Sequence, residues 1–133
     1  MKMAFKYYGP AILWALFIFI MCSINLSKVS HSSMFFPGFD KLTHCGFFLV
    51  FVVFCCYGFI KKSGIANFTF ANAFLITLYA IIFGGIIEIL QLYIFTWRSG
   101  EWNDLFADII GIGMGVFSIG FTINATQYVN IKK

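Results

Sequence analysis

The sequence predicts an all-α fold, a four-helix transmembrane bundle, and its composition is the first observation in favour. Of the 133 residues, 61% are hydrophobic and only 11% are charged, and the mean hydropathy is +0.91. A soluble domain is about half apolar and about a quarter charged, so a soluble chain with this few charges could not cover its surface. Disordered chains are poor in apolar residues, which excludes that class too. The composition therefore indicates an integral membrane protein.

The spacing of apolar stretches is the second observation. A helix needs about 20 mainly apolar residues to cross the bilayer. Short polar connectors separate stretches of this kind, which run at about residues 7–26, 42–60, 70–95 and 102–123. The sequence shows no internal repeat and no linker long enough to divide domains. We therefore expect one transmembrane domain over residues 1–133.

The start of the first stretch has two interpretations. Lys2 and Lys6 precede the apolar residues, as in a signal peptide. The apolar stretch is long for a signal peptide, which favours an uncleaved membrane anchor. Pro10 suits the first turn of the helix, where its missing N–H costs nothing.

The distribution of basic residues, the third observation, predicts the orientation. Four spans place both termini and the second connector on one side of the membrane. That side holds six basic residues and no acid: Lys2, Lys6, Lys61, Lys62, Lys132 and Lys133. The other side holds three basic and five acidic residues: Lys28, Lys41, Arg98, Asp40, Glu88, Glu101, Asp104 and Asp108. Lysine-rich ends are typical of the cytoplasmic side, so both termini are predicted to be cytoplasmic. The basic residues are too scattered to predict a nucleic-acid partner, and the expected partner is the lipid bilayer.

Polar residues at helical spacing predict a site. Three helix faces carry polar pairs three or four residues apart, namely Asp40 and His44, Glu88 and Gln91, and Asp104 and Asp108. Gly84 continues the second face, and Gly111 and Gly115 continue the third, which lets neighbouring helices approach closely. Counted from Arg98 at the interface, Glu88 would lie about 15 Å deep. Turned inward, the three faces would form a cleft open to the outside with Glu88 at its floor.

Each of these residues has a structural and a functional interpretation. An acid at mid-membrane costs about 2.5–3.5 kcal/mol and favours a functional role, although Glu88 could simply be hydrogen-bonded to Gln91. His44 could pair with Asp40 or Asp104, or it could carry a proton or bind a ligand. Asp104 is also suited to the start of a helix, where negative charge is favourable.

The candidate site therefore combines two sets of residues. The catalytic candidates are Glu88, His44, Asp104 and Asp108, and the binding candidates are Asp40, Lys41, Gln91 and Arg98. We find no HExxH pattern and no Gly-rich phosphate loop. The cysteines lack metal-site spacing. We therefore expect no metal and no cofactor.

The set of polar motifs resembles the VanZ-like family of bacterial membrane proteins. The residues that carry the resemblance, in chain order, are Asp40-Lys41-x-x-His44, Glu88-x-x-Gln91, Arg98, Asp104, Gly111 and Gly115. The sequence departs from the pattern at Asp108, where many members carry Asn. The resemblance implies a plasma-membrane protein of the bacterial envelope, and the namesake of the family is linked to reduced teicoplanin sensitivity. The family brings no agreed biochemical activity.

Two classes of function fit these residues. The first is a binding or modulating protein whose outer site engages a lipid-linked cell-wall component, a glycopeptide or a membrane partner. The second is a membrane-embedded enzyme that performs acid–base or metal-assisted chemistry on a lipid-linked substrate. A proton-coupled carrier fits less well, because the inner half of the spans has no matching polar residues.

The predicted orientation can be tested by cysteine labelling. A Ser99→Cys variant should react with an impermeant thiol reagent added outside the cell, and a Ser63→Cys variant should not, because the lysine-rich connector is expected to be cytoplasmic. Labelling of the Ser63→Cys variant alone would reverse the orientation and place the polar site on the inner side.

Overall fold

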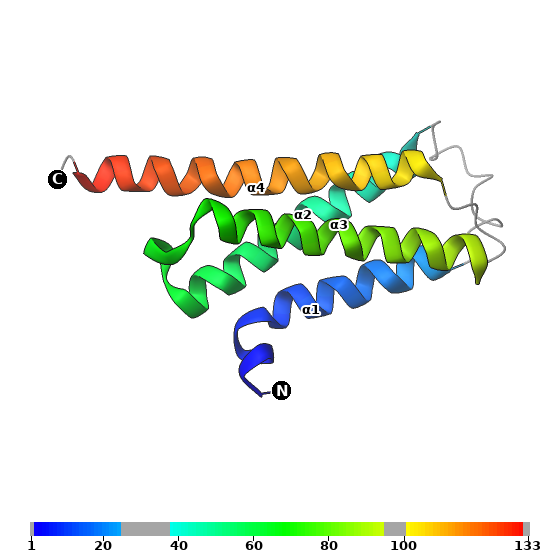
Figure 1. The fold of residues 1–133 in the computed structure, drawn as a ribbon, viewed down its shortest axis with the longest axis horizontal. Coiled ribbons are helices and arrows are strands. Elements are labelled where there is room, and N and C mark those ends of the chain that lie inside the picture. The colour runs from blue at the N-terminus through cyan, green and yellow to red at the C-terminus, as the bar shows by residue number, and fades with distance from the viewer. Residues whose placement is uncertain (1, 25–37, 95–100, 132–133) are drawn as a thin grey trace.

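The fold is a bundle of four long helices. A computed structural model describes residues 2–24, 38–94 and 101–131 (Figure 1). These residues form α1 (Lys2–Ser23), α2 (Phe39–Ser63), the short 3₁₀ turn η1 (Ile65–Asn67), α3 (Phe70–Tyr93) and α4 (Trp102–Ile131), with no strand in the described ranges. Each of the four α-helices is long and apolar enough to cross a membrane. The prediction of an all-α, four-helix transmembrane bundle is confirmed.

The largest difference between a predicted and an observed helix boundary is at the polar end of α4. α3 and α4 begin at residues 70 and 102, as predicted, but α4 continues beyond residue 123 to Ile131. In this polar last part the Thr126 hydroxyl donates to the Thr122 carbonyl one turn back at 2.8 Å, so the hydroxyl has a partner within the helix. The predicted ends at residues 26 and 95 lie outside the described residues. Hydropathy thus identified the apolar part of α4 and not its full length.

The start of α1 lies earlier than predicted. The helix begins at Lys2, so Pro10 lies inside it and not in its first turn. A proline inside a helix removes one backbone hydrogen bond and tends to bend the helix. Accordingly, the first turns of α1 run at an angle to the rest of the helix (Figure 1).

The helices run up and down, so both termini lie at one end of the bundle (Figure 1). The short turn between α2 and α3 lies at that same end. α2 packs most extensively against α4 and next against α1, while α3 packs mainly against α4. α2 is therefore the central helix, with contacts to all the others.

The turn between α2 and α3 has clear sequence signals. Gly64 ends α2 with φ +85°, a backbone conformation that favours glycine, and its N–H donates to the Ile60 carbonyl at 2.8 Å. Thr69 then caps α3, because its hydroxyl accepts from the Asn72 N–H at 3.4 Å. The turn is thus tight and requires no long connector.

The core of the bundle contains bulky side chains such as Ile18 and Phe48, which are fully buried. The inward face of α4, in contrast, carries mostly small and polar residues. The buried residues of the first half of α4 are Asp104, Ala107, Asp108, Gly111, Ile112 and Gly115. On the same helix, Phe106, Phe117 and Phe121 are 64–74% exposed. An outward bulky surface over a small-residue interior is typical of helices that pack in lipid.

Two glycines bring α4 against the backbone of α2. A Cβ atom at Gly111 would overlap the Cys45 carbonyl group, and one at Gly115 would lie 2.9 Å from the Leu49 carbonyl oxygen. Cys45 and Leu49 are one helical turn apart on α2, so the two helices stay close over that turn. The glycines are packing residues, as the sequence predicted.

We predict that Gly111→Ala destabilises the protein by about 1–3 kcal/mol, because the added methyl group overlaps α2 backbone that cannot move independently. The control is Gly113→Ala on the same helix, where an added Cβ meets nothing within 4 Å. That variant should be neutral or up to about 1 kcal/mol more stable, since alanine favours a helix. Unfolding of the purified protein in detergent measures both. Equal effects of the two substitutions would contradict the close approach.

Candidate functional site

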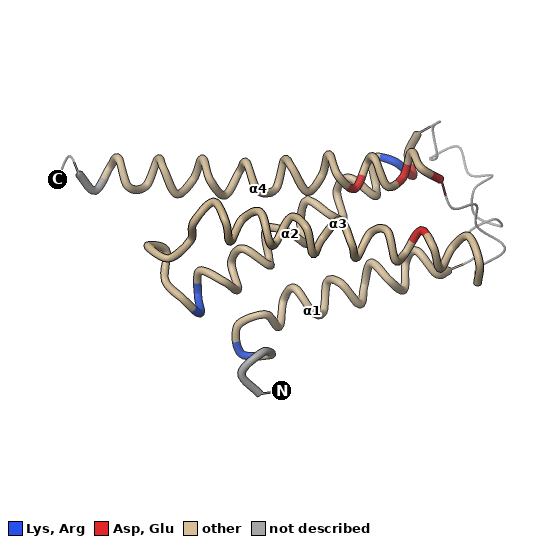
Figure 2. The backbone as a smooth tube through the Cα atoms, in the orientation of Figure 1, with Lys and Arg blue, Asp and Glu red and all other residues tan. Residues whose placement is uncertain are grey.

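All five carboxylates of the chain lie at one end of the bundle (Figure 2). They belong to the first turn of α2, the last part of α3 and the start of α4. Lys61 and Lys62, in the last turn of α2, lie at the opposite end. The charge separation predicted from the sequence is therefore present along the bundle axis.

The outer part of this end is an ion-pair group that we call the Lys41 cluster, composed of Lys41, Asp40, Glu101 and Asp104. The ammonium Nζ of Lys41 lies 3.2 Å from Asp40 Oδ2, 3.2 Å from Glu101 Oε2 and 3.4 Å from Asp104 Oδ1. The side chain of Lys41 is 37% exposed, whereas that of Asp104 is 4% exposed. One cation thus joins the starts of α2 and α4.

The inner part is a buried group that we call the His44 cluster, composed of His44, Glu88 and Asp108. The ring Nδ1 of His44 lies 3.0 Å from Asp108 Oδ1, which joins α2 to α4. One ring nitrogen and one carboxylate oxygen from each acid lie within 4.8 Å of one another. His44 is 3% exposed, Glu88 9% and Asp108 1%. Three helices therefore bring acid and imidazole groups together in the buried part of this end.

The pairing of His44 differs from the two partners expected from the sequence. Its partner is Asp108, and not Asp40 or Asp104. Asp40 and Asp104 are engaged with Lys41 instead. The difference follows from the close approach of α2 and α4, which sets His44 level with the second turn of α4.

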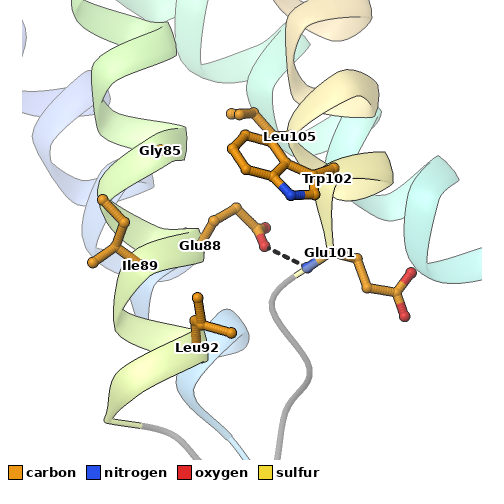
Figure 3. A pocket seen from close by; sticks show the side chains of 7 residues that line it. All are labelled: Gly85, Glu88, Ile89, Leu92, Glu101, Trp102 and Leu105. Atoms are coloured by element: carbon orange, nitrogen blue, oxygen red, sulfur yellow. Dashed lines mark hydrogen bonds between the residues drawn. The ribbon is translucent and has the colours of Figure 1, made fainter.

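Glu88 holds the start of α4. Its Oε2 accepts a hydrogen bond at 3.0 Å from the backbone N–H of Glu101, the residue before α4 (Figure 3). N–H groups at a helix start have no partner inside the helix and attract negative charge. α3 ends at Tyr93, about 7.5 Å beyond Glu88 along the axis. Glu88 therefore lies about one and a half turns before the end of α3, while its depth relative to Arg98 stays a prediction because Arg98 lies outside the described residues.

A pocket of about 250 Å³ lies beside Glu88, between α3 and α4 (Figure 3). Its lining residues are Gly85, Glu88, Ile89, Leu92, Glu101, Trp102 and Leu105. Ile89, Leu92 and Trp102 are exposed apolar side chains of spanning helices. The space beside Glu88 is therefore a lateral apolar pocket, and the polar cleft with Glu88 at its floor stays a prediction.

Several buried acceptor atoms lack a hydrogen-bond partner within the described part of the chain, namely Glu88 Oε1, Gln91 Oε1, Asp104 Oδ1 and Asp108 Oδ2. Asp104 Oδ1 still has its ion pair with Lys41 at 3.4 Å, although the geometry is not that of a hydrogen bond. Asp108 Oδ2 faces Gly84 of α3, where a Cβ atom would come within 2.9 Å of it. The interior of this end thus has more acceptors than donors among the described residues.

Gln91 has a structural contact on a different helix. Its Nε2 donates to the backbone carbonyl of Cys22 on α1 at 3.0 Å. Gln91 is only 1% exposed. Gln91 therefore fastens α3 to α1, and its contact is not with Glu88. Arg98, the remaining binding candidate, lies outside the described residues.

Sequence reasoning omitted two residues of this site from its candidates. Glu101 belongs to the Lys41 cluster through its side chain and supports Glu88 through its backbone. Trp102 lines the pocket, although the sequence alone is equally consistent with an interfacial anchor. One sequence signal could have identified Glu101: it is an acid directly before the start of α4, and the preceding span carries the acid Glu88.

The chain has no match among protein-family models, curated proteins or solved structures. The chemistry of the site must therefore follow from its own groups. Carboxylates and imidazole accept hydrogen bonds and bind cations, and they also transfer protons. A ligand that suits this site carries donors or positive charge.

We predict that Gln91→Leu destabilises the protein by about 1 kcal/mol, because it removes a buried hydrogen bond between helices. Gln127→Leu, at an exposed position of α4, is the control and should have little effect. Unfolding in detergent compares the two variants. If Gln91→Leu unfolds like the wild-type protein, Gln91 does not hold α1 in place.

Proposed function

We propose that the chain is a VanZ-like protein of the bacterial plasma membrane that engages an amphiphilic component of the cell envelope at its charged end. The observation that carries the proposal is the double position of Glu88. Its carboxylate belongs to the buried His44 cluster and also lines the apolar pocket between α3 and α4. A single ligand can therefore contact polar and apolar groups at once.

The pocket favours a ligand that arrives from the lipid phase. Its apolar wall, which includes Ile89, Leu92 and Leu105, is suited to part of a hydrocarbon chain. Glu88 at the same wall accepts hydrogen bonds from hydroxyl or amino groups. A lipid-linked cell-wall component combines these two chemistries.

The orientation supports an extracytoplasmic site. The six basic residues predicted on the inner side favour cytoplasmic termini, which puts the five acids outside. Lipid-linked wall components and glycopeptides meet at that surface. The resemblance to the VanZ-like family is what links this site to glycopeptide sensitivity. Its motif residues Asp40, Lys41 and Asp104 belong to the Lys41 cluster, and His44 belongs to the His44 cluster.

The alternative function is a membrane-embedded enzyme that acts on a lipid-linked substrate. One observation favours it: His44 Nδ1 lies 3.0 Å from a buried Asp108 oxygen. A carboxylate that fixes one ring nitrogen of a histidine orients the other for proton transfer. Glu88 and Asp104 would then be the further acids. Turnover of a lipid-linked wall intermediate by purified protein, lost in His44→Gln, would favour the enzyme over a binding protein.

We predict that Glu88→Gln abolishes the effect of the protein on glycopeptide sensitivity while its membrane level stays normal. Glutamine keeps the shape and can still accept from Glu101 N–H, but it cannot carry charge. Asp104→Asn should behave in the same way. The measurement is glycopeptide sensitivity of cells that express each variant at matched membrane levels.

Two controls separate function from folding. Gln127→Leu, at an exposed position near the opposite end of α4, leaves the pocket and both clusters unchanged and should retain function. Glu88→Leu should lower the folded yield, because the Glu101 N–H loses its acceptor. A fully active Glu88→Gln variant would leave Glu88 as a packing residue and end the charged-site proposal.

A further inference from the structure

We infer that the His44 cluster binds one divalent transition-metal ion. The ligands are a ring nitrogen of His44 and one carboxylate oxygen each of Glu88 and Asp108. These atoms come from α2, α3 and α4 and lie within 4.8 Å of one another. Metal binding is measured directly, so this inference stands or falls separately from the envelope function proposed above.

The distances suit an ion after a small adjustment of the side chains. Zinc lies about 2.0–2.2 Å from nitrogen and carboxylate ligands, so the ligand atoms around one ion are roughly 3–4 Å apart. Three groups already within 4.8 Å need shifts of less than about 1 Å to reach that arrangement. Such shifts are within the reach of carboxylate side chains with free torsion angles.

The unpartnered acceptors are the second observation. Glu88 Oε1 and Asp108 Oδ2 are buried without a hydrogen-bond partner within the described residues. Leaving a carboxylate oxygen buried without a donor or a cation is unfavourable, even where the other oxygen of the group has a partner. A bound cation would satisfy both oxygens at once. The other oxygens are already used, since Glu88 Oε2 accepts from Glu101 N–H and Asp108 Oδ1 contacts His44.

The Lys41 cluster shows by contrast why the inner group, and not the outer one, is the metal site. Asp40, Glu101 and Asp104 are also close enough to hold an ion. Their centre, however, holds the Lys41 ammonium at 3.2–3.4 Å from an oxygen of each acid. No Lys or Arg ammonium or guanidinium contacts the His44 cluster among the described residues. Within residues 2–24, 38–94 and 101–131, no Lys or Arg thus gives the inner acids the cation that Lys41 gives the outer acids.

The ligand set indicates the class of metal. One imidazole with two carboxylates favours Zn²⁺ or Mn²⁺ over Mg²⁺ and Ca²⁺, which prefer oxygen ligands alone. The Glu101 N–H that holds Glu88 Oε2 would orient this carboxylate for the ion, as supporting hydrogen bonds do in metal sites. Three protein ligands leave at least one coordination position for water or a bound molecule.

The absence of a metal motif in the sequence does not oppose this inference. Local motifs such as HExxH arise when two ligands share one helix. Here each ligand comes from a different helix, at residues 44, 88 and 108. Convergence of three helices leaves no local spacing to recognise, so the sequence alone favoured a site without metal.

The experiment uses full-length protein in detergent. The protein is stripped with a chelator, equilibrated with Zn²⁺ or Mn²⁺, separated from free ion, and analysed for metal content. We expect about one ion per chain in the wild-type protein and a loss of at least about fivefold in Glu88→Gln and Asp108→Asn. Glu101→Gln, which keeps all three ligands and the backbone N–H that holds Glu88, should retain the ion.

Thermal unfolding provides a second measurement that does not need the variants. Zn²⁺ or Mn²⁺ should raise the unfolding midpoint of the stripped wild-type protein, because an ion that binds only the folded state stabilises it. Mg²⁺ at the same concentration should not. Wild-type protein that takes up no ion would overturn the inference. Retention of the ion in both inner variants, loss of it in Glu101→Gln alone, or an equal response to Mg²⁺ would overturn it as well.

Discussion

The close approach of α2 and α4 is the constraint on which the charged end depends. At Gly111 the α4 backbone lies so near the Cys45 carbonyl that no side chain fits between them. His44 precedes Cys45, and Asp108 lies one turn before Gly111, so the same crossing brings these two side chains to 3.0 Å. A bulkier residue at the crossing would separate the helices and break the pair. The glycines thus determine the geometry of the site without taking part in it.

Buried acids in a membrane bundle require compensation, and the two clusters obtain it differently. In the Lys41 cluster a single ammonium serves acids from α2 and from the start of α4. In the His44 cluster the described contacts are one imidazole and one backbone N–H. Breaking a buried charge pair usually costs more than the pair contributes, because the remaining charge is left alone. The stability of the His44 cluster therefore depends on any further donor or cation that binds to its carboxylates.

The elements were predictable from the sequence because their signals are local. The polar break before Phe70 with Thr69 as cap, and the polar connector before Trp102, mark helix starts that the structure reproduces. The acidic end was also predictable, since charge and helical spacing are read directly from the chain. In the same way, Gly111 and Gly115 on one stripe indicated a close helix crossing.

The partners within the site were not predictable, because they depend on how far each helix slides past its neighbour. Asp104 and Asp108 are one turn apart, and only the crossing at Gly111 decides which of them meets His44. Gln91 shares a helix face with Glu88, yet its amide reaches the Cys22 carbonyl on α1. Backbone partners of this kind have no signature in residue identity. For the same reason, the Glu101 N–H could not be foreseen as the partner of Glu88.

The contact between Glu88 and Glu101 N–H has a consequence for how the site communicates with the surface. The carboxylate lies near the end of α3, and the N–H lies at the far end of the connector that follows. Any ligand that takes Glu88 Oε2 must compete with this bond, and any partner that displaces Glu101 must release the carboxylate. Such competition is reciprocal by thermodynamic necessity. Binding of a partner that displaces Glu101 and binding of a ligand to Glu88 are therefore coupled equilibria. The hydrogen bond between Glu88 and the Glu101 N–H couples them, because each binding event breaks it.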